Sequence, residues 1–407
     1  MNVTFGVFML ILLCSGISYA QSAGETLNFK TVVQLAYQHH PDMLNARASL
    51  KLAQGDFINA RSFSNPEIEL GLGDESSFEL RQPFSPLGVG FLKSKIAKNE
   101  VKIQEQYLKS SWGSVYTKVW QIYSDVLISQ NQLELAEQNL ESMRHFFGEV
   151  QIRYQSGRAL KNEVQRAKIE LLKTESEFLQ VQGKLREAKA RVNLAIGRSI
   201  DVDFKTEEQL NEYELDLEIE QIKAKALANR PDIKIAGLRV DSARNNLAKE
   251  QLSRLPSFFL GLQKTNKESD KDYTVLLGFS IPIWNLNQGE VKKANAQKEL
   301  QEANQSITVN EALLDVHTAF WDVELKKQQL DLFKASVEEA HELLRLAHTR
   351  YGEGKIDFLN YLDQVSAVIE AKTSYYQALL NYSQSISHLE VSMNQSLRGE
   401  EGFHEKP

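Results

Sequence analysis

Cysteine is nearly absent from this chain of 407 residues, because Cys14 is the only one. It lies inside the apolar segment MNVTFGVFMLILLCSGISYA, whose end at Ser18–Ala20 has the small residues of a secretory signal-peptide cleavage site. We therefore predict that residues 1–20 are a signal peptide. Its removal after Ala20 would leave a mature chain without disulfides or thiol chemistry. Lipidation of Cys14 is the alternative, although Leu13 before it is not a small residue.

A second long apolar run, an excess of basic charge and clusters of reactive residues are also missing. No later segment approaches the ~20 consecutive apolar residues that a membrane-spanning helix needs. The net charge of −7 argues against a nucleic-acid partner, which would require a basic surface. The eight histidines do not cluster, and the mature chain has only Met43, Met143 and Met393 as thioethers. We therefore expect no metal site, no cofactor, no catalytic residues and no enzymatic activity.

Prolines are few, but six of the eight recur in pairs and reveal an internal repeat. The segment that begins HPDMLNARASLK aligns with RPDIKIAGLRVD at an offset of 190 residues. The matched prolines are Pro41 with Pro231, Pro66 with Pro256, and Pro83 with Pro282. Two copies of one structural unit are therefore predicted.

Residues 21–407 are predicted to form one protomer in which both copies have the same order of elements. Each copy has a helix, two short strands, a very long helix, a turn and a long helix. The copies span about residues 25–197 and 217–394, with a connecting segment at 198–216 and a flexible C-terminal tail at 395–407. The strands are expected at residues 65–72, 77–84, 256–263 and 273–282, with KTNKESDKD as a longer loop between the last two.

A seven-residue apolar repeat marks the long helices. It runs through Leu108–Val150 with Ser129 as its polar exception, and through Ala312–Ala347 with Lys326 at the equivalent place. This pattern predicts long antiparallel coiled-coil helices. The helix from about Val89 to Gly148 would be roughly 90 Å long. An ordinary antiparallel bundle is the alternative.

The predicted strands alternate apolar residues with polar or small ones, as in YTVLLGFSI. This alternation is typical of a strand between lipid and a lumen, but a soluble sheet packed on helices has the same pattern. Four strands cannot close a barrel within one chain. If they span a membrane, their open edges exclude a monomer.

The turns between the long helices are nearly identical, with RYQSG at Arg153–Gly157 and RYGEG at Arg350–Gly354. Together with the duplicated order of elements, they resemble the TolC family of outer-membrane efflux proteins over essentially the whole mature chain. The segment FSIPIWNLNQGEVKKANAQ is most similar to the subgroup that serves heavy-metal efflux pumps of the cobalt-zinc-cadmium and copper-silver type.

The resemblance implies a mainly α fold with a small β part. Three protomers would pool twelve strands into one outer-membrane β-barrel and twelve helices into a periplasmic α-barrel, with most of the chain in the periplasm. It further implies a passive exit duct, which receives substrate from an inner-membrane pump of the resistance-nodulation-division type through a periplasmic adaptor. Heavy-metal cations are the candidate substrate. A periplasmic coiled-coil adaptor or scaffold protein is the alternative function.

The resemblance also assigns functions to residues near the turns. Adaptor-docking tips would be Arg153, Tyr154, Gly157, Arg350 and Gly354, although the glycines could instead serve only to allow a positive φ. The periplasmic constriction would involve Glu163, Tyr351, Asn360 and Asp363. Relatives have acidic residues at both of the last two positions, and they use the tyrosine to link the inner helix pair to the position of Glu163. Asp363 as a solvated outer-face charge is the alternative.

Overall fold

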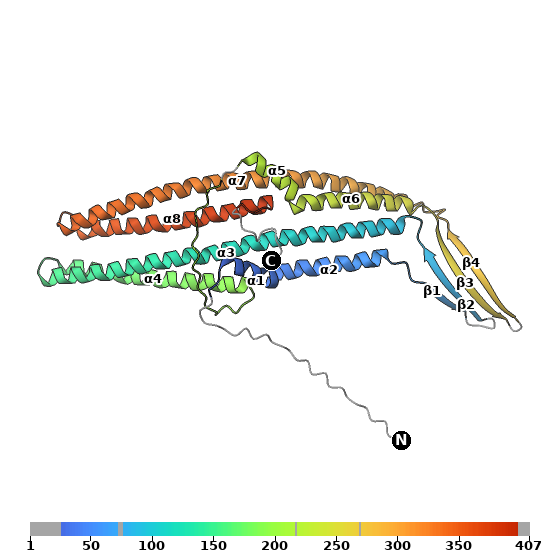
Figure 1. The fold of residues 1–407 in the computed structure, drawn as a ribbon, viewed down its shortest axis with the longest axis horizontal. Coiled ribbons are helices and arrows are strands. Elements are labelled where there is room, and N and C mark those ends of the chain that lie inside the picture. The colour runs from blue at the N-terminus through green and yellow to red at the C-terminus, as the bar shows by residue number, and fades with distance from the viewer. Residues whose placement is uncertain (1–25, 72–75, 216–217, 268–269, 398–407) are drawn as a thin grey trace, which may run out of the picture.

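The structure, a computed structural model, describes residues 26–71, 76–215, 218–267 and 270–397. Figure 1 shows an elongated molecule with a four-stranded sheet at one end and two turns between helices at the other. Residues 29–39 and 219–229 pack on the long helices in the middle of the molecule, which we call the waist. The predicted signal peptide lies outside the described residues. Of the predicted tail, residues 395–397 are described, and the Leu397 N–H donates to the buried Glu390 carboxylate at 2.7 Å.

The duplicated order of elements is confirmed, except that two helices, not the single predicted helix, precede the strands in each copy, because a new helix begins at Pro41 and at Pro231. The first copy consists of α1 (Phe29–His39), α2 (Pro41–Arg61), β1 (Glu67–Gly71), β2 (Ser76–Phe84), α3 (Val89–Gln155) and α4 (Lys161–Ala195). The second consists of α5 (Ile219–Asn229), α6 (Pro231–Leu252), β3 (Ser257–Lys267), β4 (Asp270–Ser280), α7 (Gln288–Gly352) and α8 (Phe358–Met393). Both Pro41 and Pro231 begin a helix, where the missing N–H of proline is no loss.

The four predicted strands form one antiparallel sheet in the order β1-β2-β3-β4. The predicted loop KTNKESDKD is wrong for most of its length, because β3 continues to Lys267 and β4 begins at Asp270. Thr265 pairs with both Ser77 of β2 and Asp272 of β4. Backbone hydrogen bonds of a ladder do not depend on side-chain polarity, so the polar sequence did not end the strands.

Helix α3 is longer than predicted. Gly148 does not end it, and the helix continues to Gln155, which gives 67 residues or roughly 100 Å. The residues after Gly148 form helices well, and a methyl group placed on Gly148 would contact nothing within 4 Å. A single glycine in a helix interior weakens the helix by only about 1 kcal/mol, which the surrounding turns of α3 overcome.

The helices lie side by side in an open array. Helix α3 packs on α2 and α4 along one side and on α6 and α8 along the other, and α6 and α8 in turn pack on α7. Within the described residues, α7 does not pack on α2 or α4. The array therefore has two free edges, which an ordinary closed bundle would not have.

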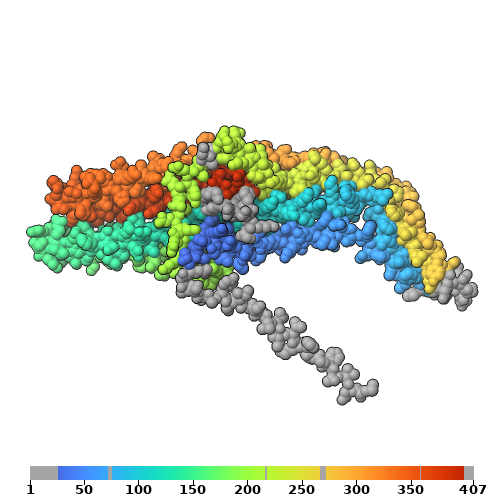
Figure 2. Space-filling model, viewed as in Figure 1, coloured from blue at the N-terminus to red at the C-terminus, as the bar shows by residue number. Residues whose placement is uncertain are grey.

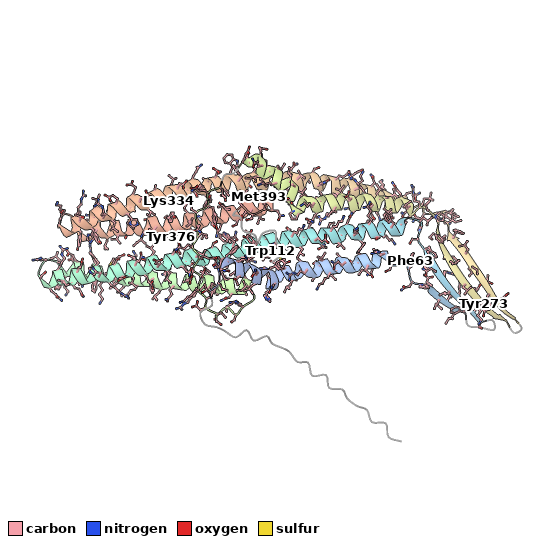
Figure 3. All side chains as sticks on the ribbon, in the orientation of Figure 1. Phe63, Trp112, Tyr273, Lys334, Tyr376 and Met393 are labelled. Carbon is pink, nitrogen blue, oxygen red and sulfur yellow. The ribbon has the colours of Figure 1, made fainter. Side chains whose placement is uncertain are left out.

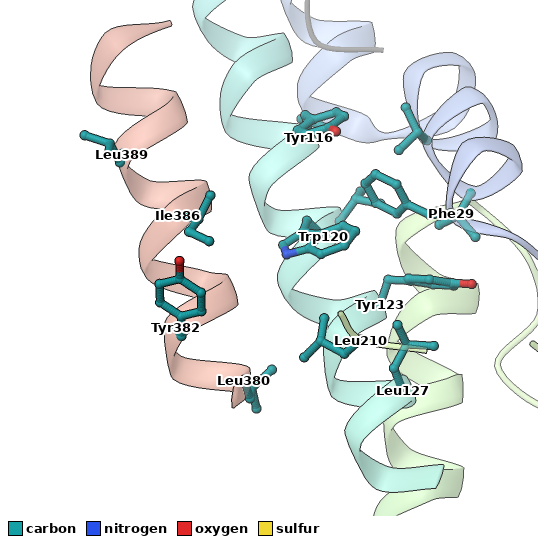
Figure 4. Packing of buried hydrophobic residues seen from close by; sticks show 14 of the residues in the cluster. Phe29, Tyr116, Trp120, Tyr123, Leu127, Leu210, Leu380, Tyr382, Ile386 and Leu389 are labelled. Atoms are coloured by element: carbon teal, nitrogen blue, oxygen red, sulfur yellow. The ribbon is translucent and has the colours of Figure 1, made fainter. Parts of the chain in front are cut away.

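The largest hydrophobic core lies at the waist, where α8, α3, α1 and α4 meet (Figure 4). The Phe29 ring packs edge-on against Trp120, with ring centroids 4.6 Å apart. The Trp120 indole N–H donates to the Ser383 hydroxyl at 3.0 Å, which joins α3 to α8 inside the core. The Tyr123 hydroxyl donates to the Glu208 carboxylate at 2.5 Å. The Trp120–Ser383 bond thus joins the first hairpin (α3 and α4) to the second (α7 and α8) at the waist, and the other two contacts attach α1 and the connecting segment to α3.

The connecting segment between the copies forms a band across the waist, seen in yellow-green in Figure 2. The Tyr213 carbonyl accepts a hydrogen bond from the Tyr382 hydroxyl at 2.6 Å. Glu212 forms ion pairs with Lys327 and Lys334 of α7, and hydrogen bonds from both lysines lower the pKa of its carboxyl group. The band thus joins the first copy to the outer helix of the second.

Candidate functional site

The two turns far from the sheet have the same backbone structure. In the second turn, the Lys355 N–H donates to the Arg350 carbonyl at 2.8 Å and the Gly354 N–H to the Tyr351 carbonyl at 3.0 Å. The first turn has the equivalent bonds, from Arg158 to Arg153 at 2.8 Å and from Gly157 to Tyr154 at 3.0 Å. This pair of bonds is the Schellman motif that ends many helices. The repeated RYxxG sequence therefore encodes one repeated helix end.

Both turn glycines have a φ of +72°, which side chains rarely adopt. A Cβ atom on Gly157 or Gly354 would meet nothing within 4 Å. The positive φ therefore explains each glycine within the protomer, and the space beside each turn is open to another molecule.

Three aromatic side chains pack together next to the second turn. Tyr351 of α7 and Tyr361 of α8 stack with ring centroids 5.0 Å apart, and Phe146 of α3 lies 5.4 Å from Tyr361 and 5.7 Å from Tyr351. We call these three residues the aromatic cluster. Phe146 is buried and the two tyrosines are half-buried. The cluster joins the first hairpin to the second near their ends.

Charged residues of the first hairpin act on Tyr351. The Arg153 guanidinium lies 5.1 Å from the centre of its ring, a cation–π contact. Burial raises the pKa of the Tyr351 hydroxyl, Arg153 lowers it, and the carboxylates of Glu163 and Glu149 raise it further. Glu163 thus lies close enough to influence Tyr351 by its charge. The structure brings these three predicted residues, Arg153, Glu163 and Tyr351, into one region.

The other predicted residues lie on the surface. Tyr154, Gly157, Arg350 and Gly354 are exposed on the two turns. Asn360 and Asp363 are exposed in the first turns of α8, where a spacing of three residues places them on one helix face. The Asn360 N–H donates to the Asp357 carboxylate, which caps α8, at 2.9 Å.

Phe146 and Tyr361 belong to this region but were not predicted as site residues. Phe146 stands beside the seven-residue stripe of α3 rather than in it, and sequence alone gave it no partner. The adjacent pair Phe146-Phe147 was a signal, because two bulky aromatics on neighbouring positions need two different packing surfaces.

Among the described residues, no three histidine, cysteine, aspartate or glutamate side chains are placed to hold a metal ion together. None of the described helices combines the length and apolar character that crossing a membrane requires.

Comparison with known proteins gives one family match. The model of the family described as "Outer membrane efflux protein" matches residues 89–198 and 223–395, one segment in each copy. The matched segments include both long helical hairpins.

Individual relatives are distant. "Toxin and drug export protein A" of Aggregatibacter actinomycetemcomitans is 25% identical over 181 residues, which cover 42% of this chain and 40% of that protein. "Probable outer membrane lipoprotein SilC" of Salmonella typhimurium is 20% identical over 286 residues, or 68% of this chain and 62% of that protein. The chain thus spans less than two thirds of either relative's length.

The fold is similar to that of solved structures along nearly all its length. The Campylobacter jejuni CmeC outer membrane channel superposes with a TM-score of 0.78 at 15% sequence identity, over 99% of this chain and 95% of that one.

Proposed function

The chain belongs to the outer membrane efflux protein family, and from this premise we propose that three protomers assemble into one passive duct. As a member of this family it is an exit channel for efflux across the outer membrane. In the proposed assembly, the sheets of three copies form a barrel in the membrane and the helices form a tunnel in the periplasm.

The free edges of the molecule support this assembly. The sheet ends at β1 and β4, and the helix array ends at α2 with α4 and at α7. Since β1 directly follows α2 and β4 directly precedes α7, sheet and helices share the same two edges. Unpaired strand edges need partners within a membrane. Joining the β4–α7 edge of one protomer to the α2–β1 edge of the next would pair the free strands of the sheets and cover the free edges of the helix arrays at once.

Cross-linking in detergent tests the assembly. Lysine cross-linkers applied to the mature protein should give a ladder of bands that ends at the trimer. A stable monomer, with its strands still protected from protease, would contradict the proposal.

The exposed turns are the proposed docking sites for a periplasmic adaptor, with Arg153, Tyr154, Gly157, Arg350 and Gly354 as contact residues. The open space beside each glycine supports this assignment. Three copies would present six turns of identical backbone. The adaptor would in turn connect the duct to an inner-membrane pump.

We assign the constriction of the duct to the helix ends beside these turns. The aromatic cluster would hold the two hairpins of each copy together, with Glu163 adjusting Tyr351 by its charge. Asn360 and Asp363 would face the axis, where threefold symmetry places three Asp363 carboxylates in a ring that favours cations. Planar-bilayer recordings of Asp363→Asn test this: cation preference and block by multivalent cations should weaken. Unchanged selectivity and block would place Asp363 on the outer face.

The substrate is proposed from the sequence resemblance to heavy-metal efflux ducts, which favours cations. Deletion of the gene should lower the tolerance of the cells to the exported cation. Complementation of the deletion with the Asp363→Asn variant should restore this tolerance only in part.

A further inference from the structure

The two faces of the sheet differ sharply in polarity. One face carries the apolar residues of all four strands, which pair across the sheet as Ile68 with Leu80, Leu80 with Leu262, and Leu262 with Val275. The other face carries mostly charged, polar and small residues, although Phe259 and Leu276 also belong to it, and the Glu79–Arg81 ion pair at 2.8 Å lies there. The apolar side chains at the centre of the first face, Leu262, Val275 and Leu277, are 45–71% exposed in the protomer.

The apolar face continues past the end of β4. Tyr273, Val275, Leu277 and Phe279 are exposed at every second position of β4, and Ile281, Ile283 and Trp284, which follow the strand, are exposed as well. The seven residue steps from Tyr273 to Ser280, the last residue of β4, span about 23 Å at ~3.3 Å per residue. With a strand tilt of about 40°, the strand accounts for roughly 18 Å of membrane depth, and the exposed apolar residues after it lengthen the band toward the ~25 Å of outer-membrane proteins.

Aromatic residues stand at both ends of this band. Figure 3 shows Tyr273 toward the far end of the sheet and Phe63 at the end next to the helices. Trp284 follows the band at the helix end and is 96% exposed. Tyrosine and tryptophan prefer the membrane–water interface, because an apolar ring there can keep its polar group in water.

Each of the four junctions between a helix and a strand exposes a large apolar side chain. These residues, which we call the collar, are Phe63, Leu87, Leu255, Ile283 and Trp284. All four junctions lie at the same end of the sheet, because every strand pair begins and ends next to the helices. The protomer itself leaves the collar uncovered.

Exposed basic residues accompany three of the four junctions. Arg61 precedes Phe63, Arg254 precedes Leu255, and Lys93 lies in the first turns of α3 after Leu87. At the fourth junction, the Glu290 carboxylate is paired with Lys293 at 2.8 Å. Arginine and lysine next to an apolar surface suit the phosphate groups of lipids.

We propose that the collar binds phospholipid head groups at the periplasmic surface of the outer membrane, with the Trp284 ring at the membrane–water interface and Tyr273 at the opposite interface. This inference rests on the proposed function and deepens it by fixing how far the sheet enters the bilayer. The collar sets this depth because moving it into water or into the acyl chains would expose Trp284 or bury the basic residues.

Tryptophan fluorescence tests the position of Trp284. The purified protein is inserted into vesicles whose phosphatidylcholine carries bromine either near the glycerol backbone or near the bilayer midplane. Bromine quenches a tryptophan that it contacts, so quenching should be stronger with the shallow bromines. Trp284→Phe should remove roughly half or more of this quenching, since Trp112 and Trp120 are buried at the waist. Trp321→Phe, which changes an exposed tryptophan of α7 far from the sheet, should leave it unchanged.

A second variant provides a depth standard. Leu277→Trp in the Trp284→Phe background places the only membrane tryptophan near the middle of the band, and the deep bromines should then quench more strongly.

The possible results are distinct. Trp284 quenched by aqueous acrylamide but not by lipid would place it in the lumen, and protection from both quenchers would place it against a neighbouring copy. Either result overturns the collar while leaving the channel intact. A protein that fails to float with the vesicles would overturn the membrane assignment and the collar together.

Discussion

The first and second turns have the same backbone but opposite surroundings. Tyr154 and Tyr351 occupy equivalent positions, 197 residues apart, in the same Schellman motif. Tyr351 is half-buried in the aromatic cluster, whereas Tyr154 is exposed. A repeated sequence therefore gives a repeated helix end, but the neighbours of that end decide whether the tyrosine packs.

The partners of Tyr351 have equivalents at the same offset. Phe146 corresponds to Leu343, and Tyr361 corresponds to Val164. Within one protomer, Leu343 belongs to α7 at the free edge of the helix array and is 45% exposed, and Tyr154 is exposed as well. In the proposed trimer, Leu343 would contact Tyr154 and Val164 of the next protomer. The end of the tunnel would then alternate aromatic contacts within each protomer with smaller aliphatic contacts between protomers.

The largest effect is expected from disrupting the aromatic cluster within a protomer. Phe146→Ala removes a buried aromatic ring, and we expect it to lower the free energy of opening the hairpin ends by about 3 kcal/mol. Hydrogen exchange of residues 143–165 and 345–365 measures this. Leu343→Ala at the equivalent position is the control, with a loss below ~1 kcal/mol in the monomer, since Leu343 is 45% exposed. Equal losses would contradict the difference between the two turns.

A smaller effect is expected at the turn glycines, where the backbone and the docking explanations can be separated. Asparagine tolerates a positive φ, and this chain itself uses Asn394 at φ +50° to end α8. Gly354→Asn should therefore keep the fold and the trimer. If the turn docks an adaptor closely, the added side chain should still reduce adaptor cross-linking severalfold. Gly157→Asn is the matched variant. Full cross-linking in both would show that the glycines serve only the backbone.

Pairs of introduced cysteines can distinguish contacts between protomers from contacts within one protomer. The predicted mature chain has no cysteine, so a short thiol cross-linker would react only at introduced sites. Tyr154→Cys with Leu343→Cys should give dimers and trimers on a denaturing gel. Phe146→Cys with Tyr351→Cys should cross-link inside one chain and remain at monomer mass. Monomer mass for both pairs would contradict the proposed neighbour contact.

The smallest effect is expected at the starts of α2 and α6 next to the waist, where His40 of the first copy corresponds to Arg230 of the second. His40 caps α2, and its Nδ1 atom accepts a hydrogen bond from the Asp42 N–H at 3.2 Å. Burial lowers the pKa of His40, Asp42 raises it, and Lys118 lowers it. The equivalent Arg230 at α6 stays charged and is paired with Asp232.

The folded state binds the His40 proton less readily than the unfolded state does. The stability of the α1–α2 region is therefore full above a pH of about 6.5, and part of it is lost as the pH falls below this value and His40 becomes protonated. Hydrogen exchange of α1 and α2 should thus increase from about pH 8 to about pH 5 relative to α5 and α6, after correction for intrinsic rates. His40→Asn keeps a capping side chain and should remove this pH dependence. The same dependence in the variant would assign it to another group.

Local patterns in the sequence predicted most of the fold. The paired prolines gave the repeat, the seven-residue stripe gave the long helices, and alternation gave the strands, because each depends on neighbours within a few residues. The errors arose where local signals conflicted with the wider structure. Gly148 looked like a helix end and Lys264–Asp272 like a loop, but the ladder with β2 and the continuing helix proved stronger.

The sequence by itself determined the two helix ends at Gly157 and Gly354, since a positive φ is a property of one residue and its own hydrogen bonds. Only the tertiary structure decided that Phe146, Tyr351 and Tyr361 come together while Tyr154 stays exposed. The two copies have nearly the same local energies, so the sequence pattern cannot distinguish their tyrosines. The difference arises because packing joins helices more than a hundred residues apart, and an open array gives one turn a neighbouring helix and leaves the other at an edge.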